Sequence, residues 1–527
     1  MESPFSHRFN TNYVPSDEEI ACIRNDLVLH TRELERIDER IHELPSQRDQ
    51  LQAYVDHHRA LISHPRRLPP DIVREIFVGC LPTNRNAVMS AQEAPLLLCR
   101  ISSAWRTIAL STPRLWASLH ISFRHILSNE PRMQAVAKWL ALSAACPISL
   151  SVVYAEDHWT DWGQSSAAAL LKCLADSSAR WRHVEFTSLT RTCPEVLAAI
   201  IPPALESFKF AGSVWALTQL KVFQASSPRA LSLLLSEFGE EPLGEVVLTL
   251  PLAWDRLTHL NFQSLGGFSI PSLVTLLRRC THLISFNVAP RLDYDEIDLP
   301  TEPISLPFLE TFILRQPGSL THHAVSWLIE LVSMPQLRQF DVSTLASQGG
   351  DSYFLVPLGT KSPRLENLTI HLKSFTAQSL PETLRSFSSL TKLVVYDTGN
   401  THDGWSNDLQ DPFQPCDIEQ LLSLLTPNAE TAVVCPALQE LIFTTVFVQK
   451  PTLDAFVEGR LQSTPCFRRL EMMYKNSWAL KLMSKAEIQT YLSRDLDIIL
   501  VHGSTWGELP AASPWTGLVD EEDWSVG

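Results

Sequence analysis

The chain has 527 residues, 45% hydrophobic and 19% charged, which excludes a disordered chain and predicts more than one compact unit. A formal charge of −15 without long clusters of Lys and Arg excludes nucleic acid as an expected partner. The ten cysteines contain no CxxC pair, and no apolar stretch is long enough to cross a membrane. We therefore expect a cytoplasmic or nuclear protein with no membrane contact.

Residues 1–16 are expected to form a disordered tail, and residues 17–63 to form a helical, coiled-coil-like prefix. Its apolar residues recur every seven positions in two series, Ile20, Leu27, Leu34, Ile41, Val55 and Ile62 in the first and Ile23, Ile37, Leu44 and Leu51 in the second. Pro45 lacks the amide donor that a continuous helix needs, so a break is predicted near it. Two arrangements stay open, a hairpin packed on its own chain and a coiled coil between chains.

Residues 65–120 contain several short helical patterns rather than one long one. In "SHPRRLPPDIVREIFVGCLP" two prolines open the first turn, where a missing amide donor is tolerated, and apolar residues follow on one face. In "PLLLCRISSAWRTIALSTPRLW" apolar residues recur every three or four positions, which predicts two more short helices. Helices this short are marginal alone, so their apolar faces need a partner.

This segment resembles the F-box, a three-helix motif, and with the heptad prefix it is similar to F-box proteins of mushroom-forming fungi. The matching residues are Leu68, Pro69, Asp71, Ile72, Ile76, Phe77, Leu81, Pro82, Ile101, Trp105, Leu115 and Trp116. It departs from the family pattern at Ser102, where cysteine is usual, and in the enlarged stretch Thr83–Glu93. The resemblance implies docking to the Skp-type adaptor, and through it a cullin, of a Skp–cullin–F-box ubiquitin ligase. The adaptor-binding residues it implies are Leu68, Pro69, Ile72, Ile76, Leu81, Pro82, Leu97, Ile101, Trp105, Leu115 and Trp116.

Residues 121–505 carry a phrase close to L-x-x-L-x-L, the leucine-rich-repeat template, in which every repeat contributes a strand. Its first apolar residue recurs at intervals of 24 to 29 residues, with one double interval of 48; the positions are Trp181, Leu205, Leu231, Leu257, Leu283, Leu309, Leu337, Leu365, Leu390, Leu438 and Phe467. Helix-like runs lie between these phrases. We predict an α/β fold, a solenoid with about twelve parallel strands.

The outward-facing residues of the predicted strands are the expected contacts of a target protein. Side chains of a strand alternate between faces, so the residue between the two core positions of each phrase points outward. These residues are Lys209, Asn261, Asn287, Ile313, Asp341, Thr369, Val394 and Ile442. The row becomes more apolar towards its C-terminal end, which favours target binding at Ile313, Asp341, Thr369, Val394 and Ile442.

The remaining segments suggest neither catalysis nor a cofactor. No nucleophile elbow, phosphate-binding loop, dinucleotide fingerprint or metalloprotease motif occurs in the sequence. Residues 396–415 are expected to form a polar loop, and residues 506–527 an acidic C-terminal tail. The chain is therefore predicted to be a substrate-receptor subunit of the ligase, not an enzyme, with an unknown target protein. The alternative is a non-catalytic scaffold that uses the solenoid and the prefix for assembly without ubiquitin transfer.

Overall fold

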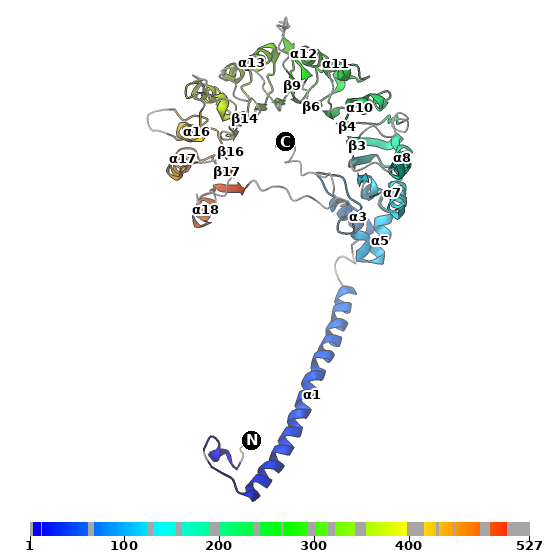
Figure 1. The fold of residues 1–527 in the computed structure, drawn as a ribbon, viewed down its shortest axis with the longest axis vertical. Helices are drawn as coiled ribbons and strands as arrows, with labels where there is room; N and C mark the ends of the chain where they lie inside the picture. Colours follow the sequence, from blue (N-terminus) through cyan, green and yellow to red (C-terminus); the bar gives the residue numbers. More distant parts are fainter. Residues whose placement is uncertain are drawn as a thin grey trace. The chain divides into compact units, whose positions relative to one another are not determined.

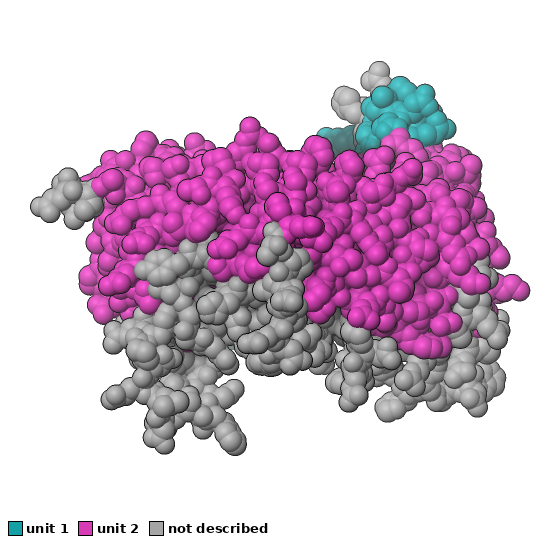
Figure 2. Space-filling view, turned by 90° about the horizontal axis from the view of Figure 1, so that it is seen from above, with its two compact units in different colours: residues 1–76 teal, residues 77–527 magenta. Residues whose placement is uncertain are grey.

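The structure is a computed structural model that divides the chain into two compact units, residues 1–76 and residues 77–527 (Figure 2). The residues it describes are 4–11, 13–61, 68–123, 126, 130–153, 161–189, 200–235, 243–264, 268–291, 302–314, 322–342, 355–397, 416–427, 432–445, 448–474 and 485–502. The predicted tail 506–527 and most of the predicted loop 396–415 lie outside these residues.

The first unit is dominated by one long helix, α1 (Asp17–Leu61), which continues through Pro45. The predicted break at Pro45 is therefore wrong, and so is the hairpin that depended on it. Proline removes a single amide donor, and the helical hydrogen bonds on either side suffice to continue the helix. Ser16 begins the helix with reciprocal bonds, because its hydroxyl accepts from the Glu19 amide and its own amide donates to the Glu19 carboxylate.

Before α1 the structure describes residues 4–11 and 13–16, which belong to the segment predicted to be a disordered tail. They include a short 3-10 helix, η1 (Ser6–Arg8). Arg8 forms an ion pair of 3.0 Å with Glu19, and the Tyr13 hydroxyl donates to the same carboxylate at 2.7 Å. These bonds, together with the one from the Ser16 amide, lower the pKa of Glu19. These bonds hold the residues before α1 against the first turn of that helix.

The predicted short helices after the prefix are present. They are α3 (Pro70–Gly79), α4 (Leu98–Ile101), α5 (Ser103–Leu110) and the 3-10 helix η2 (Pro113–Trp116). The Ser102 hydroxyl caps α5 by accepting from the Trp105 amide, which gives a physical role to the residue that departs from the family pattern. The division between the two compact units falls inside α3.

The second unit contains a leucine-rich-repeat solenoid with a single parallel sheet of fourteen strands, each paired with the next along the chain. Figure 1 shows the strands on the inner side of the curved unit and the helices on its outer side. The strands are β1 (Ser118–Ser122), β2 (Ile148–Val153), β3 (Trp181–Leu189), β4 (Ser207–Gly212), β5 (Ala230–Leu235), β6 (His259–Ser264), β8 (Ser285–Val288), β11 (Thr311–Leu314), β13 (Gln339–Val342), β14 (Asn367–His371), β15 (Lys392–Tyr396), β16 (Glu440–Thr445), β17 (Arg469–Tyr474) and β18 (Asp497–His502).

Helices and short elements fill the outer layer of the repeats. The helices are α7 (Glu130–Leu142), α8 (Asp161–Ala175), α10 (Val214–Gln219), α11 (Leu243–Leu248), α12 (Ile270–Arg279), α13 (His322–Leu331), α14 (Leu355–Lys361), α15 (Ser379–Arg385), α16 (Ile418–Leu425), α17 (Lys450–Ser463) and α18 (Lys485–Leu492). The 3-10 helices are η3 (Ser178–Arg180), η4 (Trp254–Arg256) and η5 (Leu372–Ser374). Two two-stranded sheets join β7 (Phe268–Ser269) to β9 (Pro290–Arg291), and β10 (Ile304–Ser305) to β12 (Val332–Ser333).

The core is built from the alternate residues of each strand, as the period of two requires. Where the repeats carry Phe in place of the template Leu, the rings of successive strands contact one another. The Phe312 ring lies 5.6 Å from that of Phe286 and 5.7 Å from that of Phe340, between ring centroids. All three side chains are buried. Aromatic contacts thus link neighbouring repeats through β8, β11 and β13.

Hydrogen bonds from basic side chains join neighbouring repeats on their helical side. Basic side chains donate to carbonyls near the C-terminal end of the helix one repeat earlier, where unpaired carbonyls and the helix dipole favour a cation. Arg180 reaches Leu140 in α7, Arg279 reaches Leu248 in α11, Lys361 reaches Ile329 and Glu330 in α13, and Arg460 reaches Leu425 in α16. Each bond replaces water at a helix end with a group from the next repeat.

The predicted repeat register is confirmed for most strands and wrong for one. Leu231 pairs with Phe208 and Leu260, so it occupies the second apolar position of its phrase and not the first. Across the double interval β15 pairs directly with β16, so no strand lies between these two in the sheet. The sheet also has two more strands than the twelve predicted, since β1 and β18 extend it at the ends.

The stretch Thr83–Glu93 protects the N-terminal edge of the sheet. Val88 forms a parallel bridge with His120 in β1, and the His120 amide donates to the Ala87 carbonyl at 2.7 Å. Ala87 and Val88 are buried. An exposed edge strand invites pairing with other chains, so this stretch covers it.

The cysteines that precede strands are buried turn residues in two of the described repeats. Cys280 and Cys435 are buried. Burial raises the pKa of each thiol to about 12, which keeps both protonated and unreactive at neutral pH.

Candidate protein-binding surfaces

Helix α3 is apolar on two faces, and only one of them is buried. Val73 and Phe77 are buried, and the Phe77 ring packs on Trp105 with centroids 4.8 Å apart. Ile72 and Ile76, also predicted adaptor contacts, remain 49% and 45% exposed. A helix that is apolar on both sides normally has both covered. The exposed side of α3 is therefore a candidate binding surface.

The other residues of the predicted adaptor surface fall into three groups by exposure. Leu68, Pro69, Leu97 and Ile101 are exposed, and Leu81, Pro82 and Trp105 are half-buried. Leu115 and Trp116 are buried. The Trp116 indole donates to the Ala109 carbonyl at 2.9 Å and packs edge-on against Trp139. In place of the predicted adaptor contact, these two side chains fix α5 to the first repeat.

The inner side of the solenoid presents one continuous row of outward-facing strand residues. The strand pairing aligns, from β1 to β18, His120, Ser151, Glu185, Lys209, Ser232, Asn261, Asn287, Ile313, Asp341, Thr369, Val394, Ile442, Glu471 and Ile499. All eight outward residues predicted from the sequence lie in this row, which we call the inner row. It contains members that the sequence analysis missed, because the phrase is weaker in β1–β3, β17 and β18 and was misaligned in β5.

The N-terminal half of the inner row is polar, and its members bond to one another. The His120 ring nitrogen Nδ1 lies 2.8 Å from the Ser151 hydroxyl, and Lys209 forms an ion pair of 2.8 Å with Glu185. The Asn261 amide donates to Ser232 at 3.1 Å. Polar pairs that already satisfy one another gain less from a partner, because binding must first replace these bonds. The side-chain Oδ1 atoms of Asn261 and Asn287, by contrast, are buried without a hydrogen-bond partner.

In the C-terminal half of the inner row, Val394 and Ile442 form an apolar pair with a charged rim. Glu471 belongs to both the row and the rim and lies between Ile442 and Ile499. Val394, Ile442 and Ile499 are half-buried, and Tyr396 and Met473 flank them two residues further along their strands. The rim consists of two ion pairs, Lys392–Glu440 at 3.3 Å and Arg469–Glu471 at 2.7 Å. An apolar centre with a polar rim is the arrangement of a protein interface.

Two of the five predicted target-binding residues are too buried to contact a partner. Asp341 and Thr369 are 5% and 8% exposed, because neighbouring strands lie only about 4.8 Å apart and adjacent side chains cover short ones. Ile313, Val394 and Ile442 stay accessible. Tyr396 and Met473 could have been found from the sequence by continuing the alternation of each strand by two residues.

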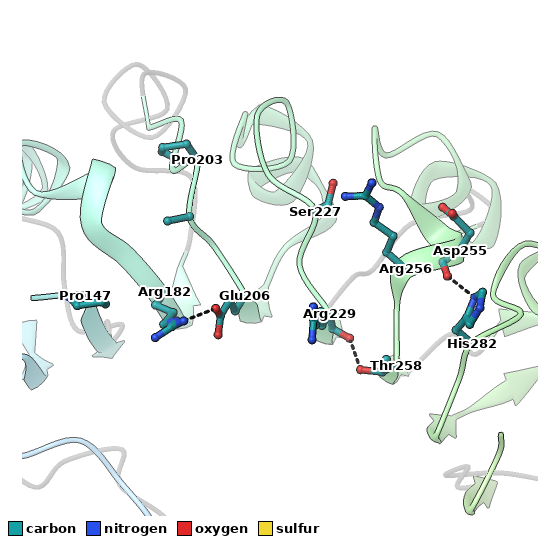
Figure 3. Close-up of a pocket in the computed structure, with 11 residues that line it drawn as sticks. Pro147, Arg182, Pro203, Glu206, Ser227, Arg229, Asp255, Arg256, Thr258 and His282 are labelled. Carbon is teal, nitrogen blue, oxygen red and sulfur yellow. Dashed lines mark hydrogen bonds and ion pairs between the residues drawn. The ribbon is translucent and has the colours of Figure 1, made fainter.

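An open groove of about 740 Å³ runs along the N-terminal ends of strands β3 to β8 (Figure 3). Arg182 and Glu206 form an ion pair of 2.6 Å across two strands, and the bond from Arg182 lowers the pKa of the Glu206 carboxyl. Further along, the His282 ring nitrogen Nδ1 lies 2.9 Å from the Asp255 carbonyl. The groove is lined by charges of both signs, so its electrostatics favour neither an anionic nor a cationic ligand.

Within the described ranges, no three His, Cys, Asp or Glu side chains come together in a way that could hold a metal ion. No helix in those ranges has the length and apolar character needed to cross a membrane.

Comparisons with known proteins give the following results. No family model matches the chain, and no curated protein matches it. Among solved structures, the crystal structure of a TLR13–ssRNA13 complex matches with 12% identity and a TM-score of 0.33, over 67% of this chain and 45% of that one. A protein from Bacteroides fragilis matches with 10% identity and a TM-score of 0.21, over 69% of this chain and 68% of that one. This chain thus spans less than half of the TLR13 chain it matches.

Proposed function

We propose that this protein is the substrate-receptor subunit of a Skp–cullin–F-box ubiquitin ligase. The segment around α3 and α4 binds the Skp-type adaptor, the inner side of the solenoid binds the target protein, and the chain itself carries no catalytic residues. The F-box resemblance supplies the identity of the adaptor. The leucine-rich-repeat solenoid provides a surface suited to protein binding.

The observation that carries the proposal is the uncovered apolar face of α3. Ile72 and Ile76 lie on this face, and Leu97 and Ile101 expose apolar side chains at α4. Exposed apolar groups of this size mark sites where a partner protein excludes water. The F-box pattern assigns the same four residues to the adaptor contact, so two independent lines of reasoning select them.

The adaptor site is tested by the double variant Ile76→Asp with Ile101→Asp. Both side chains are exposed, so we expect thermal unfolding to change little. Adaptor co-purification should be lost, because truncation of a central apolar anchor costs about 2 kcal/mol or more and a buried charge costs more. Leu110→Asp is the matched control, since Leu110 is exposed in α5 but outside the predicted contact set. Undiminished adaptor binding by the double variant would remove the basis of the proposal.

A variant of the Leu-Pro pair that opens the F-box pattern supplies a second test of the same site. Leu68→Ala with Pro69→Ala removes the two residues that open the motif, both exposed at the start of α3. We expect loss of adaptor co-purification and normal unfolding of the solenoid, because neither side chain is part of its core. If the adaptor and cullin do not co-purify with the parent chain at all, the scaffold function replaces the receptor function.

The target site is tested at the apolar end of the inner row, with Val394→Asp and Ile442→Asp. Both side chains are half-buried and face outward, so folding and adaptor binding should persist while target capture falls. Ser232→Asp is the control, because it introduces the same charge at an equivalent position of the polar half. Proximity labelling by the parent, the variants and the control then identifies targets that only the apolar variants lose. Unfolding of both variants would show that these residues belong to the core.

A further inference from the structure

The apolar seam of α1 is exposed to solvent along its length. Leu27, Leu34, Ile41, Leu44 and Leu51 are 54% to 67% exposed, and nothing in the described part of the first unit covers them. These residues belong to the two heptad series, so they lie along one stripe of the helix. A soluble helix with such a stripe requires a second helix against it.

The straight course of α1 excludes the helix itself as that partner. Its 45 residues reach about 67 Å at about 1.5 Å per residue, and they contain no turn that could fold one half onto the other. We propose that a second copy of α1 covers the seam as an antiparallel, two-stranded coiled coil. This dimer does not depend on the adaptor or on the target protein.

The two series match each other when the copies run in opposite directions. In the register that places Leu27 of one copy against Leu44 of the other, Ile20 faces Leu51 and Leu34 faces Ile37. The two polar residues of the seam, His30 and Arg48, then face Ile41 and Ile23 and not their own kind. The twofold axis repeats each of these layers, so the same surface is used on both copies. The paired region then covers residues 20–51, about 48 Å of helix.

The charges beside the seam select the antiparallel direction. In this register Glu33 lies beside Arg40 of the other copy, and the axis repeats the pair. A parallel dimer would place Glu33 beside Asp38 of the other copy and would stack Arg48 on Arg48 within the seam. Charges at these flanking positions determine the orientation of coiled coils, and like charges oppose association.

The size of the full chain in solution tests the dimer, and one charge reversal tests its direction. Glu33→Arg should weaken the antiparallel dimer by about tenfold in Kd, since two exposed attractions become repulsions. In a parallel dimer the same variant would gain a bond to Asp38 and bind more tightly. The swap Glu33→Arg with Arg40→Glu should restore the Kd of the parent.

Sedimentation over a range of concentrations gives these Kd values, and circular dichroism confirms that each variant keeps its helix. A parent chain that is monomeric at all concentrations overturns the dimer. Tighter association of Glu33→Arg overturns the direction.

Cysteine cross-linking tests the register separately. In a Cys22→Ser background, which removes the exposed thiol of α1, copies with Leu27→Cys are mixed with differently tagged copies that carry Leu44→Cys. Oxidation should join the two kinds of copy to each other in preference to their own kind. Preferential joining of Leu27→Cys copies to one another would instead establish parallel helices.

Discussion

Replacement of Arg460 by methionine should destabilise the C-terminal repeats strongly. The Arg460 side chain is fully buried, and it donates to the carbonyls of Leu425 at 2.7 Å, Val434 at 2.7 Å and Cys435 at 3.1 Å. Methionine fills a similar volume but leaves three buried carbonyls without donors. At about 1–1.5 kcal/mol for each of the three carbonyls, the free energy of unfolding should fall by about 3–4.5 kcal/mol.

Urea denaturation measures the total change, and hydrogen exchange read by mass spectrometry locates it. Faster exchange should centre on α16, on residues 432–438 and on α17, because solenoid repeats interact mainly with their neighbours. Arg494→Met is the matched control, since Arg494 forms an exposed ion pair with Glu458 whose loss costs less than about 1 kcal/mol. If Arg460→Met cost no more than this control, the account of the buried carbonyls would be refuted.

Three further substitutions test single positions. Burial raises the pKa of Asp397, so the folded state favours its protonated form and loses stability as pH rises from the unfolded pKa through the folded one. Asp397→Asn should therefore be more stable than the parent at neutral pH, with the two melting temperatures converging at about pH 4. Gly359→Ala should lower the free energy of unfolding by about 1–3 kcal/mol, because its methyl would lie 2.8 Å from the Ser386 carbonyl. Gly79→Ala in α3, with nothing within 4 Å, should be neutral or slightly stabilising in the same urea titration.

The register of the inner row could be predicted because the outward residue of each strand lies between two apolar core residues. A leucine or phenylalanine precedes the outward residue and another large apolar residue follows it, and the period of two then leaves no choice of face. The prediction failed in β5, where Leu231 and Leu233 look like the start of a phrase, while Pro228 occupies the position that leucine takes elsewhere. The exposure of Asp341 and Thr369 could not be predicted, because it depends on the size of neighbouring side chains.

The bonds from basic residues to the preceding helix could not be predicted from spacing. Arg279 and Lys361 bond 31 or 32 residues back along the chain, and Arg460 bonds 35 residues back, because the loops differ in length. In the sequence, each bond is indicated only by a Lys or Arg near the end of a predicted helix. Such a residue is usually exposed to solvent, so it does not by itself predict a bond to the preceding repeat. At Pro45 the local pattern was strong but misleading. Proline usually breaks a helix, and yet the hydrogen bonds on both sides of it keep α1 continuous.

The alternation of core and outward residues along the fourteen strands also has a consequence for how such a protein can evolve. The accessible positions of the inner row, such as Ile313, Val394 and Ile442, alternate with the core positions, so a substitution at one of them can alter what the surface recognises while the apolar core residues stay the same. New specificity can therefore arise by substitution at a few outward sites, one strand at a time. The same separation makes the chain a scaffold for engineering, in which a contact patch can be grafted onto neighbouring strands while the helices and caps are kept.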